Sequence, residues 1–239
     1  MMRRQTNMQQ ESSLLHWFPK IKDILPVPRT GILSISPDDM FEIISLLDGE
    51  MISEELFQKI KETANKIGYP LFMRSDQGSA KHNYEHSCHV LAEDKLLGNL
   101  AHLAKWHLMV DLWPAAIVFR ELLQLYAPFT AFDGLPIAKE RRYFVDEGKV
   151  TCHHPYWPEG AIKPGRGAKN LPDGWQAMLA EISVEDESEI ACLTRLAEAF
   201  AEAVPGFYSV DFAQKTDGQW VMIDAARGEL SYHPEHKEG

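Results

Sequence analysis

The chain has 239 residues, of which 45% are hydrophobic and 25% are charged, a balance typical of a globular protein that folds without disulfides. The formal net charge of −11 repels phosphate backbones and therefore disfavours nucleic acid as a partner. Three cysteines without paired spacing, no apolar run near the roughly 18 residues that span a bilayer, and a polar N-terminus predict a cytoplasmic protein with no membrane partner.

The first part of the chain predicts helices around a single strand. We expect residues 1–13 to form a disordered tail and residues 14–68 to precede the main domain. Apolar residues at helical spacing and capping Ser or Asp residues carry the helix predictions. The expected order is an ordered stretch Leu14–Ile24, a strand Thr30–Ile35, a helix from Asp38 or Asp39 to Leu47, and a helix from Ser53 to Gly68.

Residues 69–232 mix strands with helices, which predicts an α+β domain of two lobes, 69–122 and 123–232, followed by a tail over 233–239. Two turn signals, around Gly148 and Gly218, each join strand-like runs and predict hairpins. The expected elements are the strands Pro70–Arg74 and Ala116–Leu122, the helices Glu93–Met109 and Glu187–Val204, and the hairpins Arg142–Val145 with Lys149–His153 and Tyr208–Ala213 with Gln219–Ala225.

The last hairpin carries two aspartates. Alternation along the first strand places Asp211 on one face with Ser209 and Ala213, and Asp224 lies on the neighbouring strand. Adjacent carboxylates repel each other unless a cation lies between them, and magnesium takes one or two carboxylates plus nucleotide phosphates. We therefore predict a metal site at Asp211 and Asp224. The alternative is a pair of hairpin aspartates that face water.

A short polar loop follows the strand that ends at Arg74. Its small residues, including Ser79, let backbone N–H groups approach phosphate oxygens, and the cations Arg74 and Lys81 can neutralise them. The loop is thus a candidate phosphate site, although a plain surface turn has the same composition.

Two further strands carry charges. Arg120 and Glu121 interrupt an apolar strand, which predicts either a hinge edge that binds adenine or a strand end at the surface. Glu140 and Arg142 share one strand face. Arg142 can hold a terminal phosphate or stabilise a transferring phosphoryl group; the alternative is a cross-strand salt bridge.

The order of these features resembles the ATP-grasp superfamily. More closely, it is similar to the divergent clade that includes the eukaryotic cell division cycle protein 123 and many bacterial and phage relatives. The resemblance extends from about Trp17 to Ser231. The residues that carry it are Trp17-Phe18-Pro19-Lys20, Arg74-Ser75-Asp76, Ser79, Lys81, Arg120-Glu121, Glu140, Arg142, Phe144, Asp211 and Asp224.

The resemblance implies two lobes with ATP between them and a magnesium ion on the two aspartates. It further implies a carboxylate–amine ligase that acts through an acyl-phosphate, with a peptide or protein as substrate, or else an ATP-binding assembly factor that makes no bond. The implied nucleotide-binding residues are Arg74, Ser79, Lys81, Arg120, Glu121, Glu140 and Arg142, of which Lys81 and Arg142 are catalytic.

One position departs from the clade. The clade places an asparagine two residues after the second carboxylate, as a further metal ligand, but here that residue is Ala226. The usual glutamate is also shortened to Asp224. Either Glu229 or a water fills the gap, or metal binding is weaker, so turnover is in more doubt than nucleotide binding.

Two other features suggest different roles. His82, His86 and His89 with Cys88 suggest zinc, but Asn83 stands where a metalloprotease has its general base, so we expect these histidines to line the cleft or face water. The stretch Pro158–Gly174 is basic through Lys163, Arg166 and Lys169, and we expect a loop that contacts substrate or forms a mobile lid.

Overall fold

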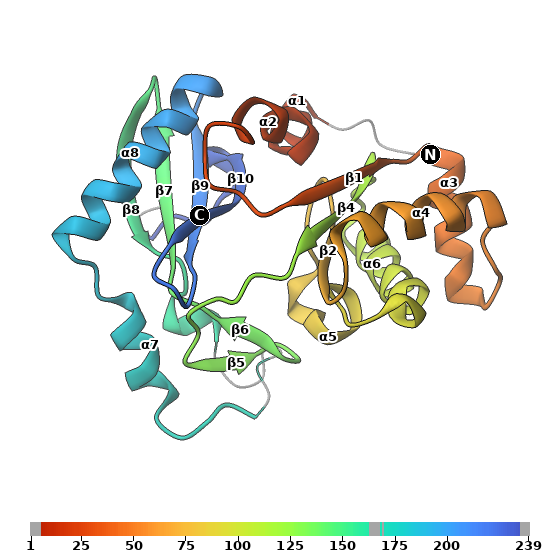
Figure 1. Cartoon of the computed structure of the whole chain (residues 1–239). Coiled ribbons are helices and arrows are strands. Elements are labelled where there is room, and N and C mark those ends of the chain that lie inside the picture. The colour runs from red at the N-terminus through yellow and green to blue at the C-terminus, as the bar shows by residue number, and fades with distance from the viewer. Residues whose placement is uncertain (1–5, 163–167, 169, 235–239) are drawn as a thin grey trace.

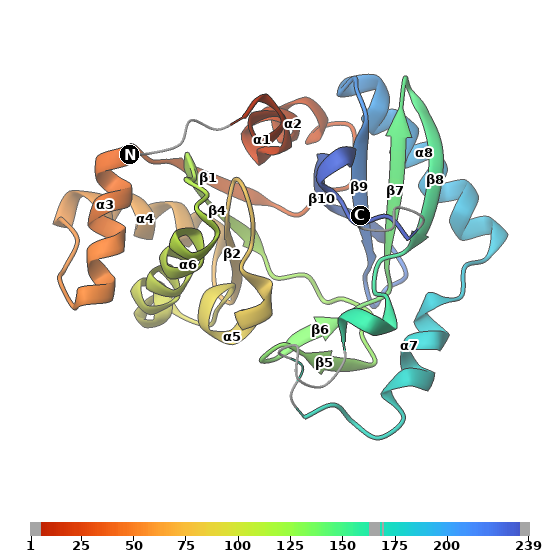
Figure 2. The same cartoon turned by 180° about the vertical axis from the view of Figure 1, so that it is seen from behind.

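Two antiparallel four-stranded sheets, each covered by helices, form two lobes that face one another (Figures 1 and 2). The structure is a computed structural model that describes residues 6–162, 168 and 170–234. The α+β prediction is confirmed. Lys163, Arg166 and Lys169 lie outside the described residues, so the role expected for that basic loop stays a prediction.

The first lobe contains a sheet in the order β1-β4-β2-β3, with helices packed on it (Figure 1). Its core joins Met73 and Phe119 of the sheet to Ile60 and Leu100 of the helices. The elements are β1 (Thr30–Ser34), α3 (Pro37–Ser45), η1 (Leu46–Asp48), α4 (Glu54–Ile67), β2 (Leu71–Ser75), η2 (Lys81–Asn83), α5 (Tyr84–Ser87), β3 (His89–Val90), η3 (Glu93–Lys95), α6 (Leu96–Val110) and β4 (Ala116–Glu121).

The caps of the first helices follow elementary rules. Ser53 caps α4 and Gly68 ends it, as predicted. The cap of α3 is Ser36, not Asp38 or Asp39. Ser36 accepts from the N–H of Asp39 while the carboxylate of Asp39 accepts from the N–H of Ser36, so Asp39 is the third residue of a capping box.

The second lobe contains a sheet in the order β10-β9-β7-β8. Helix α8 covers one face, where Leu193 and Phe200 pack against Val210 and Phe212. The smaller β5–β6 hairpin and α7 lie below this sheet in Figure 1. The elements are β5 (Phe129–Ala131), β6 (Leu135–Ile137), β7 (Glu140–Asp146), β8 (Lys149–Pro155), η4 (Glu159–Ala161), α7 (Trp175–Ser183), α8 (Glu187–Ala203), β9 (Tyr208–Gln214), β10 (Trp220–Arg227) and η5 (Gly228–Leu230).

The N-terminal residues bridge the two lobes. Residues 7–12, expected within a disordered tail, form helix α1 (Asn7–Ser12), because Thr6 and Gln9 make a capping box. Helix α2 (Leu14–Ile21) follows, and both helices lie between the lobes in Figures 1 and 2. The Ser13 hydroxyl donates to Asp76 of the first lobe at 2.7 Å, and Ser12 Oγ accepts from the backbone N–H of Arg227 at 2.9 Å.

Strand β1 also joins a lobe. It pairs with β4 along its length, from Thr30 opposite Arg120 to Ser34 opposite Ala116. The segment expected to precede the main domain therefore supplies the edge strand of the first sheet. Among the helices of the described residues, none has the length and apolar character needed to cross a membrane.

Candidate active site

A cleft between the lobes brings the predicted site residues together. It encloses about 820 Å³ of empty space, counting its open mouth. Side chains from both sheets line it, and every predicted site residue except Arg142 is among them. These residues are Arg74, Ser79, Lys81, Arg120, Glu121, Glu140, Asp211 and Asp224. The rest of the lining is largely apolar, with Phe72, Leu122, Leu123, Leu125, Leu135, Pro136 and Ile223.

A row of ionisable residues crosses the second-lobe sheet. Asp224 on β10 is opposite Asp211 on β9, Asp211 is opposite Arg142 on β7, and Arg142 is opposite His154 on β8. Cross-strand partners project from the same face of a sheet. The strands therefore set the two predicted metal ligands and the predicted catalytic arginine side by side, and add His154 at the end.

A β-bulge places Asp224 in this row. The register of β10 against β9 shifts between Met222 and Asp224. In an uninterrupted ladder Ile223 would oppose Asp211, and Asp224 would share the buried face with Met222. The extra residue returns the carboxylate to the cleft face. The carbonyl of the bulged Ile223 accepts from Arg120 Nη1 at 2.5 Å.

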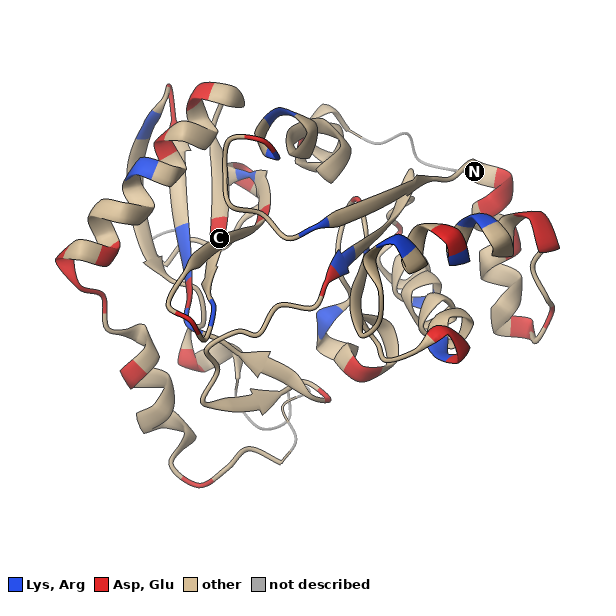
Figure 3. Ribbon diagram, in the orientation of Figure 1, with Lys and Arg blue, Asp and Glu red and all other residues tan. Residues whose placement is uncertain are grey.

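Both aspartates bond to arginines. Asp211 binds Arg142 in a fork, with Nε–Oδ1 and Nη2–Oδ2 distances of 2.8 Å. Asp224 Oδ1 lies 2.9 Å from Nη1 of Arg74, which comes from the other lobe. Figure 3 shows these opposite charges on facing strands: β7 and β9 carry Lys/Arg and Asp/Glu segments, as does the end of β4.

The same groups fit a metal and a phosphate chain. Within the described ranges, no set of three or more His, Cys, Asp or Glu side chains is arranged to hold a metal ion. A magnesium ion would thus rest on two carboxylates, with phosphate oxygens and water as its other ligands, which is its usual preference. The arginines released by the carboxylates would then bind phosphate oxygens.

Arg120 is a buried cation with unused donors. Its side chain is 3% exposed, and its Nε and Nη2 atoms have no hydrogen-bond partner in the described part of the chain. The guanidinium lies 5.9 Å from the Trp17 ring and 5.7 Å from the Phe18 ring. Burial, and then the neighbouring Arg74, lower the pKa of Arg120 to about 9. An anion that accepts from these N–H groups, such as phosphate, satisfies both the charge and the geometry.

Lys81 and Arg142 meet on one aromatic side chain. Lys81 Nζ donates to the Tyr156 hydroxyl at 2.7 Å, and the Arg142 guanidinium lies over the Tyr156 ring, 4.7 Å from its centroid. Burial would lower the pKa of Lys81, but Tyr156 and nearby carboxylates more than offset it and hold the pKa above its ordinary value. The sequence pattern indicates only core or cleft wall for Tyr156; its place directly after β8 is the signal that could have found it.

Glu140 is a buried carboxyl group in the cleft. Trp157 Nε1 donates to its Oε1 at 3.2 Å. Burial raises the pKa of Glu140 to about 7; Lys81 opposes this shift and Asp211 adds to it. Glu140 therefore exchanges its proton near neutral pH. The alternative expected for Glu140 and Arg142, a cross-strand salt bridge, has a different partner in the structure, because Arg142 bonds Asp211.

The loop after β2 differs from the expected cradle of free backbone donors. Ser75 Oγ accepts from the N–H groups of Gln77 and Gly78, both at 3.0 Å. These donors are therefore used within the loop. Gly78 also lies so close to Trp106 that an added Cβ would meet its Cη2 atom at 2.5 Å. The loop is shaped by its own contacts, and its side chains at Ser79 and Lys81 reach the cleft.

Glu121 reaches the cleft with its carboxylate already bonded. Its Oε1 accepts from the backbone N–H of Arg29 at 2.9 Å, and its Oε2 accepts from Arg29 Nε at 3.0 Å. A contact between Glu121 and adenine or ribose stays a prediction.

The substitute metal ligand considered above is engaged elsewhere. Both carboxylate oxygens of Glu229 bond to Arg227, and Glu229 does not line the cleft. Ala226 stands opposite Ser209, one row further along the sheet than Asp211. Of the two ways to fill the place of the asparagine, the structure favours a water.

The histidines near Cys88 do not line the cleft. His82 and His86 are exposed, as one of the two expectations had it. His82 stacks on Phe132 with ring centroids 4.6 Å apart, and His89 stacks on Tyr84 at 5.2 Å. The Cys88 thiol is buried and donates to the carbonyl of Ser79.

A comparison with curated proteins finds no match. The chain is similar in structure to Cdc123 from Schizosaccharomyces pombe, with a TM-score of 0.59 and 12% identity over 95% of this chain and 87% of that one. It is also similar to the D-alanine–D-alanine ligase from Bacillus anthracis, with a TM-score of 0.50 and 13% identity over 90% of this chain and 55% of that one. At these identities the likeness shows the fold. A family model described as an ATP-grasp domain, the third family of its clade, matches residues 65–238. This confirms the resemblance found in the sequence: the chain belongs to the ATP-grasp superfamily, in its Cdc123-like clade.

Proposed function

We propose that this chain binds magnesium and ATP in the cleft and converts a carboxylate into an acyl-phosphate, which an amine then attacks. ATP-grasp domains form a superfamily of ATP-dependent ligases, and this membership supports the general reaction. The observation that carries the proposal is the row in which Asp224, Asp211 and Arg142 lie side by side within reach of the first-lobe cations.

The cleft supplies charge for a triphosphate. Arg74, Lys81, Arg120 and Arg142 come together from both lobes, and the free donors of Arg120 await an acceptor. A magnesium ion held by Asp211 and Asp224 would neutralise the phosphate oxygens. We assign the base to the apolar end of the cleft, beside Leu122, Leu123 and Leu125, because a flat ring fits between aliphatic side chains.

The chemistry then needs positioning and charge stabilisation. A carboxylate oxygen attacks the terminal phosphorus and ADP leaves. Arg142 and Lys81, held by Tyr156, stabilise charge on the transferring group. The amine attacks the acyl carbon and inorganic phosphate leaves. We propose a peptide or protein as one substrate.

A second candidate is an ATP-binding assembly factor that makes no bond. Ala226 in place of the clade's asparagine favours it, since Glu229 is bonded elsewhere and the metal would have fewer protein ligands. This protein would bind nucleotide and a protein partner without turnover.

One experiment separates the two. Purified protein is given magnesium, ATP, a pool of carboxylic acids and hydroxylamine, a small nucleophile that traps acyl-phosphates, and ADP release is measured. The ligase releases ADP only when both an acid and the nucleophile are present. The assembly factor binds a non-hydrolysable ATP analogue in calorimetry and releases no ADP. Absence of both signals contradicts nucleotide binding itself.

A further inference from the structure

The ionisable row has a fourth member that nucleotide binding does not use. His154 on β8 stands directly opposite Arg142, on the side of that arginine away from Asp211 and Asp224. The order across the sheet is thus metal pair, arginine, histidine. A transferring phosphoryl group beside Arg142 would have the metal on one side and this imidazole on the other.

The imidazole of His154 is fixed in one tautomer. Its Nδ1 lies 2.7 Å from the carbonyl oxygen of Pro155. A carbonyl oxygen only accepts, so Nδ1 carries the hydrogen and Nε2 has the lone pair. That Nε2 atom is buried and has no hydrogen-bond partner among the residues described. A buried acceptor without a donor is unfavourable, so its arrangement points to an N–H or O–H group that a substrate brings.

The surroundings keep His154 neutral. Burial is the largest cause of the lowered pKa, and Arg142 and His233 add to it, while the Pro155 carbonyl and Asp211 oppose it. The rings of Tyr232 and His233, in the segment after β10, lie 6.2 and 6.1 Å from the His154 ring, and Phe144 of β7 lies at 6.0 Å. Their edges surround the imidazole, so a substrate that reaches Nε2 displaces part of this aromatic contact.

We propose that His154 is the general base that takes the proton from the attacking amine. The inference rests on the proposed ligase function and adds the residue that makes the amine nucleophilic. As the N–C bond forms and the C–O bond to phosphate breaks, inorganic phosphate leaves and the amine proton passes to Nε2. Arg142 stays with the phosphate, and the neighbouring imidazole receives the proton on the other side.

The test compares two nucleophiles on one acyl-phosphate. Hydroxylamine is unprotonated at neutral pH and needs little help from a base, whereas ethylamine is protonated and must lose a proton to react. ADP release is measured with N-acetylated amino acids as the acid pool. In H154Q the ethylamine-dependent rate should fall about 100-fold further than the hydroxylamine-dependent rate. An equal fall in both rates, or no fall with ethylamine, overturns the assignment.

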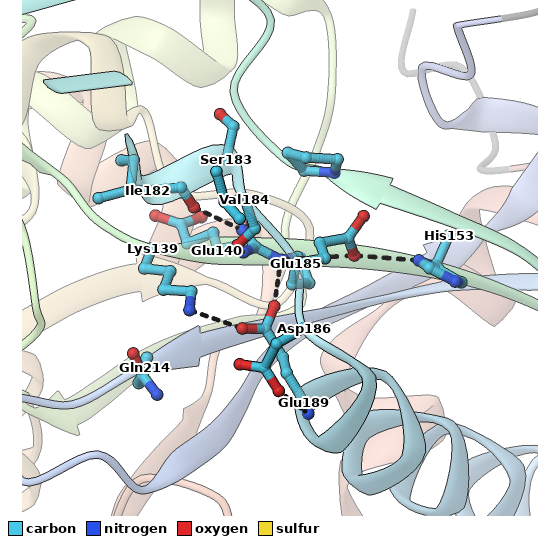
Figure 4. A network of polar contacts seen from close by, with 12 residues as sticks. Lys139, Glu140, His153, Ile182, Ser183, Val184, Glu185, Asp186, Glu189 and Gln214 are labelled. Carbon is cyan, nitrogen blue, oxygen red and sulfur yellow. Dashed lines mark hydrogen bonds and ion pairs between the residues drawn. The ribbon is translucent and has the colours of Figure 1, made fainter. Parts of the chain in front are cut away.

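The neighbouring histidine is a matched control. His153 points to the opposite face, where it bonds Glu185 at 3.0 Å and stacks on Tyr143 at 4.8 Å (Figure 4). H153Q should leave the ratio of the two rates unchanged. If wild-type protein responds to hydroxylamine but to no amine, the amine assignment is overturned; if it responds to neither, the ligase function itself fails.

A second measurement needs no substrate. Long-range nitrogen–proton NMR, with H154Q to identify the signal, should show His154 neutral at neutral pH with its hydrogen on Nδ1. A charged ring or a hydrogen on Nε2 contradicts the proposal whatever the rates.

Discussion

Glu140 is the residue of the cleft whose charge is least supported. Its carboxyl group is buried and receives one hydrogen bond from Trp157, and no arginine or lysine forms an ion pair with it in the described part of the chain. Burial disfavours the ionised form, which explains the pKa of about 7. A group of this kind makes folding stability depend on pH.

We predict that E140Q gains stability relative to the wild type as pH rises. Below the ordinary value of 4.5 the carboxyl is protonated in folded and unfolded chains, and above about 7 it is ionised in both. Between these values only the folded chain keeps the proton, so the wild type loses on the order of 3 kcal/mol as pH rises. Glutamine has no proton to lose.

Urea unfolding of both proteins at about pH 5 and about pH 8 measures this difference. The free energy of unfolding of E140Q minus that of the wild type should increase across the interval. A constant difference would contradict a raised pKa at Glu140.

For Arg120 we predict a large loss of ATP affinity with little loss of stability. Methionine keeps the bulk of the side chain against Trp17 and Phe18 but removes buried donors that lack partners in the described residues. The lost bonds to phosphate are each worth about 1.5–3 kcal/mol, so R120M should bind a non-hydrolysable ATP analogue roughly 10- to 100-fold more weakly. Calorimetry gives the affinity and urea unfolding gives the stability. Wild-type affinity in R120M would remove Arg120 from the phosphate site.

At the scale of elements, the sequence predicts the long, strongly patterned segments and misses the short ones. The helices α4 and α8 and both hairpins are confirmed, because each combines an apolar period with caps or turn residues. Short elements bury too few residues for a period to be visible. The segments absent from the sequence prediction include α1, α5, α7, β3, β5 and β6.

The candidate site was predictable in its charges and not in its geometry. The cationic and acidic residues stand out because charges in apolar strands are unusual. The bulge at Ile223 has no such signature, and strict alternation would turn Asp224 to the core. Tyr156 also escaped prediction, since its contacts with Lys81 and Arg142 join segments far apart in sequence.

Helices α1 and α2 act as one strap across the lobes, and Asp76 is its anchor in the first lobe. One oxygen of this carboxylate accepts from the Ser13 hydroxyl, and the other accepts from the N–H groups of Ala115 and Ala116 at 2.9 and 3.1 Å. The backbone N–H of Leu14 adds a bond to the carbonyl of Asp76 at 2.8 Å. The motif therefore serves the fold at Asp76, and phosphate binding at Arg74.

We predict that S13A costs about 1 kcal/mol of unfolding free energy, because one hydrogen bond is lost. D76A should cost roughly 3–5 kcal/mol, because two backbone N–H groups lose their acceptor as well. Urea unfolding measures both values. Q77A is the control: Gln77 bonds the same carboxylate from a partly exposed position and should change stability by less than about 0.5 kcal/mol. Equal effects of D76A and Q77A would contradict the anchor.

At the scale of the whole molecule, the two lobes hold each other through the groups that a nucleotide would use. Arg74 reaches Asp224, Arg120 reaches the carbonyl of Ile223, and Lys81 reaches Tyr156. A triphosphate with its metal replaces these contacts with stronger ones that still join the lobes. Ligand binding and the stability of the two-lobed arrangement are therefore linked.

We predict that a non-hydrolysable ATP analogue with magnesium raises the melting temperature. At a ligand concentration about 100 times Kd the stabilisation is about 2.7 kcal/mol, which corresponds to roughly 5–10 °C for a chain of this size. The shift should be smaller without magnesium, because the phosphates then meet the carboxylates directly.

The carboxylates themselves are tested by replacing Asp211 and Asp224 together with asparagine, which keeps their shape. The variant cannot hold magnesium through charged oxygens, and its arginines are free to bind phosphate without it. Its melting temperature should rise with the analogue by the same amount whether or not magnesium is present. A magnesium-dependent shift equal to that of the wild type would show that the metal sits elsewhere, and the row across the second sheet would then lose its assigned role.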